Sequence, residues 1–188
     1  MAGLDLVLPS IDAVPEWVAG QYYDLTNTWP AVSIGGQAAT ADTIYTSPLW
    51  VPYGGRLVDR LAINITLAAG AGNKARVGII RKAIGSPLPG ALLLDGGEVA
   101  IDALGAVAAT IDLWLPGPAL YHVAFHPQAN CSITGYAMIT GIYGAGGGGV
   151  ADQQRMTAVM TQSYGPLPAT FSATSYSAAV RRVMVRAA

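Results

Sequence analysis

Strict alternation of apolar and polar side chains is the sequence feature that most limits the fold of this chain. Within residues 57–67, Leu61, Ile63 and Ile65 alternate with small or polar residues, and residues 107–115 place an apolar side chain at every second position. A period of two is typical of a β-strand that buries one face, whereas an amphipathic helix repeats every 3.6 residues. Both segments are therefore predicted to be half-buried strands.

Other short segments rich in β-branched and aromatic residues are separated by glycine and proline turns. Further strands are expected at residues 43–51, 74–82, 91–94, 98–101, 121–126, 131–143, 169–174 and 178–186. Asp95-Gly96-Gly97 is interpreted as a hairpin turn, and residues 152–162 as a short helix or an irregular loop. Many short strands with no long helix predict an all-β fold, an antiparallel β-sandwich or a barrel.

The N-terminal part of the chain has a different character. Residues 1–35 contain three prolines and no clear strand period, yet they are rich in large apolar groups. We interpret them as an irregular leader that attaches the protein to a partner, and residues 36–188 as the β-sandwich domain. The alternative is that the leader packs against its own domain. The side chains expected to make the assembly contacts are Leu4, Leu6, Leu8, Trp17, Tyr22, Tyr23 and Trp29.

The composition favours an oligomer over a monomer. Only 11% of the 188 residues are charged and 52% are hydrophobic, against an ordinary charged share of about 25%. A monomer with so few charges has difficulty covering its surface with solvated groups. A large core beneath an uncharged polar surface would also explain the numbers, but burial against other subunits explains them better.

The distribution of charge constrains the partners. The net charge of −1 gives no general attraction to nucleic acid or to an anionic membrane. Residues 1–55 contain five acids and no base, because the first cation is Arg56. This uneven distribution of charge along the chain suits head-to-tail contact between neighbouring subunits. Because there are no basic residues near the N-terminus, we expect no signal peptide. Because there is no long apolar stretch, we expect no membrane-inserted helix.

No arrangement of residues indicates catalysis. His122 and His126 share one strand face, predicted to face solvent or an interface, and their Cα atoms would lie about 13 Å apart, too far to chelate one ion. Cys131 is expected to be a buried, inert thiol. The glycine run at residues 144–149 lacks the ending of a phosphate-binding loop. We therefore expect no enzyme activity, no cofactor and no metal site.

Aromatic residues concentrate in the early part of the chain and permit two interpretations. They could form a stacking platform for a sugar, or they could pack the leader against the sandwich or a neighbouring subunit. We favour packing. The residues concerned are Tyr22, Tyr23, Trp29, Tyr45, Trp50 and Tyr53.

Several motifs together resemble a β-sandwich module found in structural proteins of tailed phages and phage-derived particles. These motifs are SPLWVP at residues 47–52, RVGI at 76–79, PGALLLDGG at 89–97 and LPGPALYHVA at 115–124. His122 stands where the family often has tryptophan. The resemblance implies a jelly-roll-like sandwich that forms oligomers and is displayed on a virion, and it transfers no catalytic residues.

The expected function is that of a virion structural protein, such as a head spike or fibre, a decoration protein or a tail or baseplate component. It would contact other virion proteins and further copies of itself, after synthesis in the host cytoplasm. The alternative is a carbohydrate-binding or host-receptor-binding module on the phage surface, with a host glycan as partner. A hydrolase is a more distant third.

Overall fold

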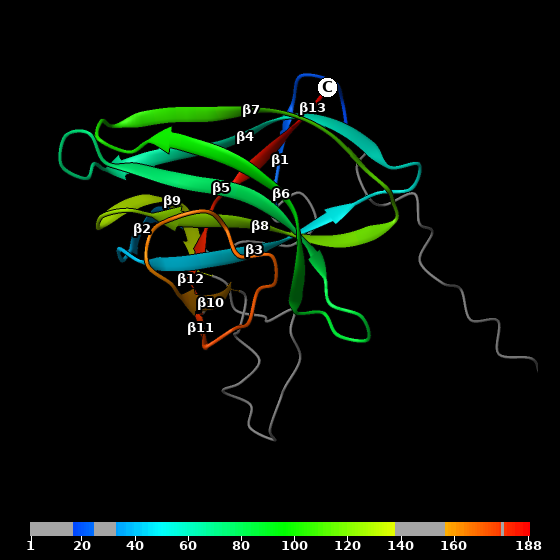
Figure 1. The fold of residues 1–188 in the computed structure, drawn as a ribbon. Coiled ribbons are helices and arrows are strands. Elements are labelled where there is room, and N and C mark those ends of the chain that lie inside the picture. Colours follow the sequence, from blue (N-terminus) through cyan, green and yellow to red (C-terminus); the bar gives the residue numbers. More distant parts are fainter. Residues whose placement is uncertain (1–16, 25–32, 138–156, 178) are drawn as a thin grey trace, which may run out of the picture.

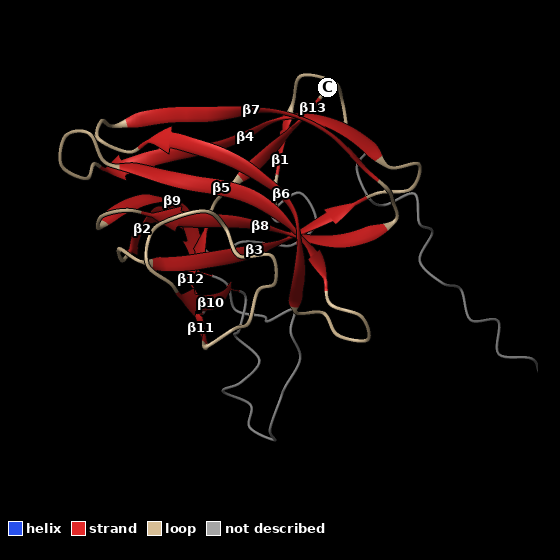
Figure 2. Ribbon diagram, viewed as in Figure 1, coloured by secondary structure: helices blue, strands red, loops and turns tan. Residues whose placement is uncertain are grey.

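The computed structural model describes residues 17–24, 33–137, 157–177 and 179–188 (Figure 1). These residues form strands joined by loops and contain no helix (Figure 2). All strand pairs are antiparallel and form two sheets. The prediction of an all-β antiparallel sandwich is thereby confirmed. In the described part of the chain, no helix is long and apolar enough to cross a membrane.

One sheet has seven strands and the order β1-β13-β4-β9-β12, with β7 paired to β4 and β2 paired to β9. The strands are β1 (Tyr22–Tyr23), β2 (Ser33–Ala39), β4 (Arg56–Leu67), β7 (Gly105–Leu115), β9 (Cys131–Ala137), β12 (Ala179–Arg181) and β13 (Met184–Ala187).

The other sheet has six strands in the order β11-β10-β3-β8-β5-β6. The strands are β3 (Thr43–Val51), β5 (Lys74–Lys82), β6 (Pro89–Ala100), β8 (Ala119–Pro127), β10 (Thr157–Thr161) and β11 (Ser175–Ser177).

The main core contains the apolar faces that the alternation predicts. Leu61 and Ile111 of the seven-stranded sheet and Val77 and Phe125 of the six-stranded sheet belong to one buried cluster. Burying a large apolar side chain contributes about 1.5–3 kcal/mol, so this cluster is the main stabilising element of the sandwich. Leu67, the next apolar residue of the alternation in β4, is exposed, and the pairing of β4 with β9 shifts register between Ile65 and Leu67.

A second apolar cluster involves the six-stranded sheet. Ile80 and Ala124 lie on strand positions that alternate with those of the main core, and they are buried with Leu167 and Phe171. The last two come from residues 162–171, which we call the cover segment. Gly78 makes room for this segment, because a Cβ built on it would lie 2.4 Å from the side chain of Leu167. The six-stranded sheet is therefore covered on both faces.

Asp95-Gly96-Gly97 is not a hairpin turn, contrary to the sequence interpretation. The three residues lie inside the continuous strand β6, opposite a register shift between Arg76 and Gly78 of β5. Gly97 has φ of 86°, and its N–H donates to Asp95 Oδ1 at 3.0 Å. Residues with turn chemistry here form a β-bulge, since an extra residue in a strand needs the same backbone freedom as a turn.

The C-terminal predictions are correct in part. Residues 157–161 form a strand instead of a helix or irregular loop, and residues 169–174 contribute only an isolated bridge between Thr170 and Ala91. The expected closing strand at 178–186 is divided into β12 and β13. The expected strand at 131–143 is described to residue 137, and the glycine run at 144–149 lies outside the described residues.

Part of the leader packs on the sandwich. β1 pairs with β13, and the ring of Trp17 stacks on that of Tyr23 at 4.7 Å with both side chains buried in the main core. Asp24 is buried too, and it accepts hydrogen bonds from Tyr136 and Arg182. β2 also begins ahead of the expected domain boundary at residue 36. Leu4, Leu6, Leu8 and Trp29 lie outside the described residues, so the attachment role of the leader stays a prediction.

Candidate functional site

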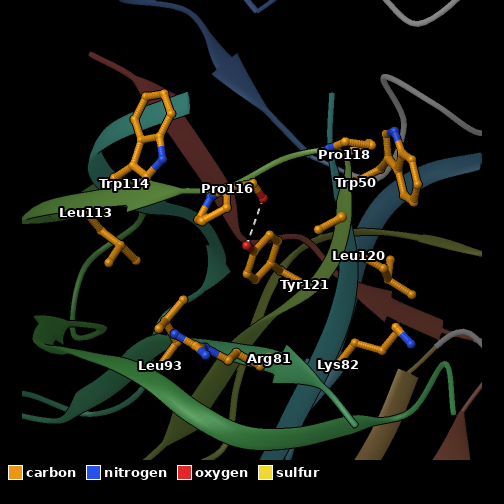
Figure 3. Close-up of a pocket in the computed structure, with 11 residues that line it drawn as sticks. Trp50, Arg81, Lys82, Leu93, Leu113, Trp114, Pro116, Pro118, Leu120 and Tyr121 are labelled. Carbon is orange, nitrogen blue, oxygen red and sulfur yellow. Dashed lines mark hydrogen bonds between the residues drawn. The ribbon is translucent and has the colours of Figure 1, made fainter. Parts of the chain in front are cut away.

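A hollow of about 830 Å³ opens at one end of the sandwich, and we call it the end hollow (Figure 3). Its walls come from the ends of β3, β5 and β7, the start of β8, and β6. It is lined by Trp50, Arg81, Lys82, Leu93, Leu113, Trp114, Pro116, Pro118, Ala119, Leu120 and Tyr121. Pockets of this size hold ligands in many proteins.

A close contact between two turns shapes the wall of the end hollow. Gly117 lies against Pro52, and a Cβ at Gly117 would be 1.9 Å from the carbonyl oxygen of Pro52. Only glycine fits this approach. The Gly117-Pro118 peptide bond is cis, and the hydroxyl of Tyr121 donates to the carbonyl of Pro116 at 2.8 Å (Figure 3). The close approach of Gly117 to Pro52 places the turn between β7 and β8 directly against the residue that follows β3.

Two tryptophans on the lining of the hollow are exposed. Trp50 is 36% exposed although both of its neighbours in β3 are fully buried, and Trp114 is 54% exposed. Trp114 lies on the solvent face of β7 and rests against Gly55, where a Cβ would lie 2.7 Å from the indole ring. Figure 3 shows the two indoles on either side of the turn that bears Pro116 and Pro118.

Two cations at the end of β5 add positive charge to the hollow. Arg81 and Lys82 are both exposed, and among the described residues no carboxylate lies within ion-pair distance of either. Tyr121 lines the same hollow. Burial raises the pKa of its hydroxyl, and the positive charge of Arg81 opposes that increase. The tyrosine is thus a neutral hydrogen-bonding group under ordinary conditions.

These features together describe a binding surface. Among the described residues, the lining has no carboxylate, histidine, serine or cysteine, and its side chains offer apolar contact, stacking and positive charge. Leucines and prolines offer burial to apolar groups, the indoles offer stacking faces, and the two cations offer attraction to an anion. The hollow suits a ligand that combines apolar groups with negative charge.

The histidines are buried, contrary to the prediction that they face solvent or an interface. His122 and His126 do alternate with the core positions of β8, but the loop before β6 and the cover segment enclose them. Nε2 of His122 lies 3.0 Å from the Pro87 carbonyl oxygen, and Nε2 of His126 lies 3.0 Å from that of Gln162. Burial lowers the pKa of His122 to about 4 and also lowers that of His126.

Cys131 is buried, and burial raises the pKa of its thiol to about 11. A thiol in that state is a poor nucleophile at neutral pH. Within the described ranges, no three His, Cys, Asp or Glu side chains are grouped so that they could hold a metal ion.

The predicted aromatic residues are dispersed in the structure. Tyr23 and Tyr45 are buried, while Tyr22 and Tyr53 are exposed, and of the five that the structure describes only Trp50 lines the end hollow. Trp29 lies outside the described residues. Neither Trp17 nor Tyr23 is exposed to a partner, because they stack on each other in the main core.

Sequence reasoning missed Trp114, Arg81 and Lys82. A signal for Trp114 was present, because it falls on the polar face of an alternating strand, two positions after Asp112. A large aromatic residue on a solvated face indicates a contact surface. No local signal connects it to Arg81 and Lys82, which lie more than thirty positions earlier.

Comparison of the sequence and structure with protein-family models, with curated proteins and with solved structures finds no match.

Proposed function

We propose that this protein is a structural subunit that assembles into a larger particle, and that the particle is a phage virion or a phage-derived one. The virion part of the proposal comes from the resemblance of residues 47–52, 76–79, 89–97 and 115–124 to structural proteins of that kind. The assembly part has an independent physical argument.

Exposed large apolar side chains near the end hollow are the observation that carries this argument. Trp50, Tyr53, Leu57 and Trp114 are each at least one third exposed, and we call this set the aromatic end. Leu57 and Trp114 are direct partners across β4 and β7, and Tyr53 lies in the turn that follows β3. Aromatic residues are enriched where proteins meet, and a contiguous exposed apolar patch is typical of an interaction site.

The scarcity of charge strengthens the argument. Of the cations in the described residues, Lys74, Arg76, Arg182 and Arg186 are held in ion pairs within the chain. The net charge of the whole chain is only −1, so long-range repulsion between separate copies is small.

Sedimentation velocity of the full chain at micromolar concentration tests the assembly part. The expected result is an oligomer, which electron microscopy of the sedimented material would show as a defined particle. A species of monomer mass over the whole micromolar range would contradict the proposal.

A second candidate function is binding of an acidic glycan. The observation that favours it is the presence in one hollow of two exposed indoles beside two cations that have no carboxylate partner in the described part of the chain, since indole faces stack on pyranose rings and cations attract carboxylates. A glycan array with the parent protein and the Trp50→Ala/Trp114→Ala variant tests it. Signals limited to uronate- or sialate-containing glycans, and lost in the variant, are expected if this candidate is correct.

A further inference from the structure

The end hollow has an apolar lining and an unbalanced positive edge. Leu93, Leu113 and Leu120 line it together with Arg81 and Lys82, and no acid of the lining offsets the two cations. A partner that fits must bring apolar side chains and negative charge on the same short segment. A purely apolar partner would leave two cations unpaired at a dry contact, which costs free energy.

The first sixteen residues of this chain have that composition. The segment reads MAGLDLVLPSIDAVPE, and it contains six leucine, isoleucine and valine residues, three acids and no lysine or arginine. Its apolar side chains Leu4, Leu6 and Leu8 are separated by single residues, and the first acid, Asp5, stands between two of them. Asp12 and Glu16 follow. An apolar segment with three carboxylates and no cation matches the hollow in both chemistry and sign of charge.

From this complementarity we propose that the end hollow of one copy binds the N-terminal segment, residues 1–16, of a second copy. The inference rests on the proposed function, because it gives that assembly its contact. It extends the sequence interpretation by naming the surface that the leader would contact.

The contact would be head-to-tail. The donor segment joins the fold at Trp17, which is held beside β13 by its stack on Tyr23 and by the hydrogen bond from Gly20 N–H to the Ala187 carbonyl at 2.8 Å. The acceptor hollow lies on the other side of β4, at the ends of β7 and β5, and the N–H of Ala188 beside the donor's anchor donates to the Leu57 carbonyl of the aromatic end at 2.9 Å. The donor segment and the described lining of the hollow share no residue, so a copy that gives its segment to a neighbour still offers its hollow to another. Heterologous contacts of this kind form rings or filaments.

Charge reversal on each side provides the test. The acceptor variant is Arg81→Glu/Lys82→Glu, and the donor variant is Asp5→Lys/Asp12→Lys, both in the full chain. Arg60→Glu/Lys74→Glu is the control for the acceptor variant, because it changes the net charge equally at residues that do not line the hollow, although it also breaks the ion pair of Lys74 with Glu98. Circular dichroism confirms that each variant folds; Arg81, Lys82 and Lys74 are exposed and Arg60 is half-buried.

Sedimentation measures the outcome. We expect each variant alone to associate at least about tenfold more weakly than the parent, because like charges meet at the contact. The Arg60→Glu/Lys74→Glu control should associate as the parent does. An equimolar mixture of the acceptor and donor variants should associate again, since each hollow then meets a segment of opposite sign. This rescue requires contact between two copies, so it supports the inference directly.

Three results would overturn the inference. If the parent forms oligomers and Arg81→Glu/Lys82→Glu associates equally well, the hollow is not the contact although the proposed function stands. If the parent is a monomer, the proposed function fails as well, and a change in tryptophan fluorescence in the donor variant would show that the segment occupies the hollow of its own chain. If a hyaluronan hexasaccharide quenches tryptophan fluorescence and a synthetic peptide of residues 1–16 neither competes with it nor dissolves oligomers, the hollow is a glycan site.

Discussion

The covered face of the six-stranded sheet and the end hollow both contain ring-bearing and charged side chains, but those of the covered face are buried or ion-paired, whereas the tryptophans and cations of the hollow are exposed. The covered face buries two histidines, and its acids Asp95 and Glu98 are paired with Arg76 of the same chain. The hollow leaves Arg81 and Lys82 without carboxylate partners among the described residues, beside two exposed tryptophans. One surface is completed by the chain itself, and the other has the chemistry of a surface completed by a partner.

The cover segment makes that difference. Its backbone N–H at Leu167 donates to Asp95 Oδ2 at 3.1 Å, and the hydroxyl of Tyr164 donates to Glu98 Oε1 at 3.1 Å. Burial is the largest factor that raises the pKa of Tyr164 to about 12. Within the described residues, the lining of the end hollow includes no residue of a comparable covering segment.

The largest contrast is expected between Phe171→Ala and Trp114→Ala. Phe171 is 4% exposed in the second apolar cluster, so its truncation should lower the free energy of unfolding by about 3–5 kcal/mol. Truncation of Trp114, which is more than half exposed, should cost about 1 kcal/mol or less. Urea denaturation of dilute protein measures both. Equal losses would show that the aromatic end is part of the core and would remove the contrast.

The next contrast concerns pH. His122 has its usual pKa of 6.5 when unfolded and about 4 when folded, so between these values the unfolded state binds more protons. Stability should therefore fall as the pH falls from 6.5 to 4, by up to about 3 kcal/mol from this residue. The lowered pKa of His126 acts in the same direction.

Denaturation curves at several pH values measure the loss, and His122→Gln keeps an N–H donor while removing the titration. If the unfolding free energy of the variant falls with pH as steeply as that of the parent, His122 is accessible to protons in the folded state. The loop that bears Pro87 would then open readily.

The smallest contrast concerns single cations. Arg76→Gln removes ion pairs with Asp95 and Glu98 beneath the cover segment and should lower stability by about 1 kcal/mol. Lys82→Gln removes no ion pair in the described residues and should leave stability unchanged. The comparison fails if Lys82→Gln is the more destabilising of the two in thermal melts at low protein concentration.

The strands could be predicted because their signal is local. In β7, Ala109, Ile111 and Leu115 are buried as the alternation requires, and Asp112 is exposed. The boundaries of β3 and β5 match the expected segments because proline and glycine turns interrupt the extended backbone there.

The covered face and the hollow could not be predicted because their signals are not local. Alternation gives the correct side of β8 for His122 and His126, but only tertiary structure shows that the cover segment lies over that side. The cover segment has no strand period and contains Pro166 and Pro168. Likewise Trp50, Arg81 and Trp114 meet in one hollow only through the topology of two sheets.

Hydroxyl-radical footprinting at increasing protein concentration tests the central claim most directly. The claim is that the end hollow is completed by a second copy and the six-stranded sheet by its own chain. Oxidation of Trp50 and Trp114 should fall as oligomers form, while oxidation of Phe171 should stay low at every concentration. Trp50 and Trp114 oxidised equally in monomer and oligomer would contradict the claim.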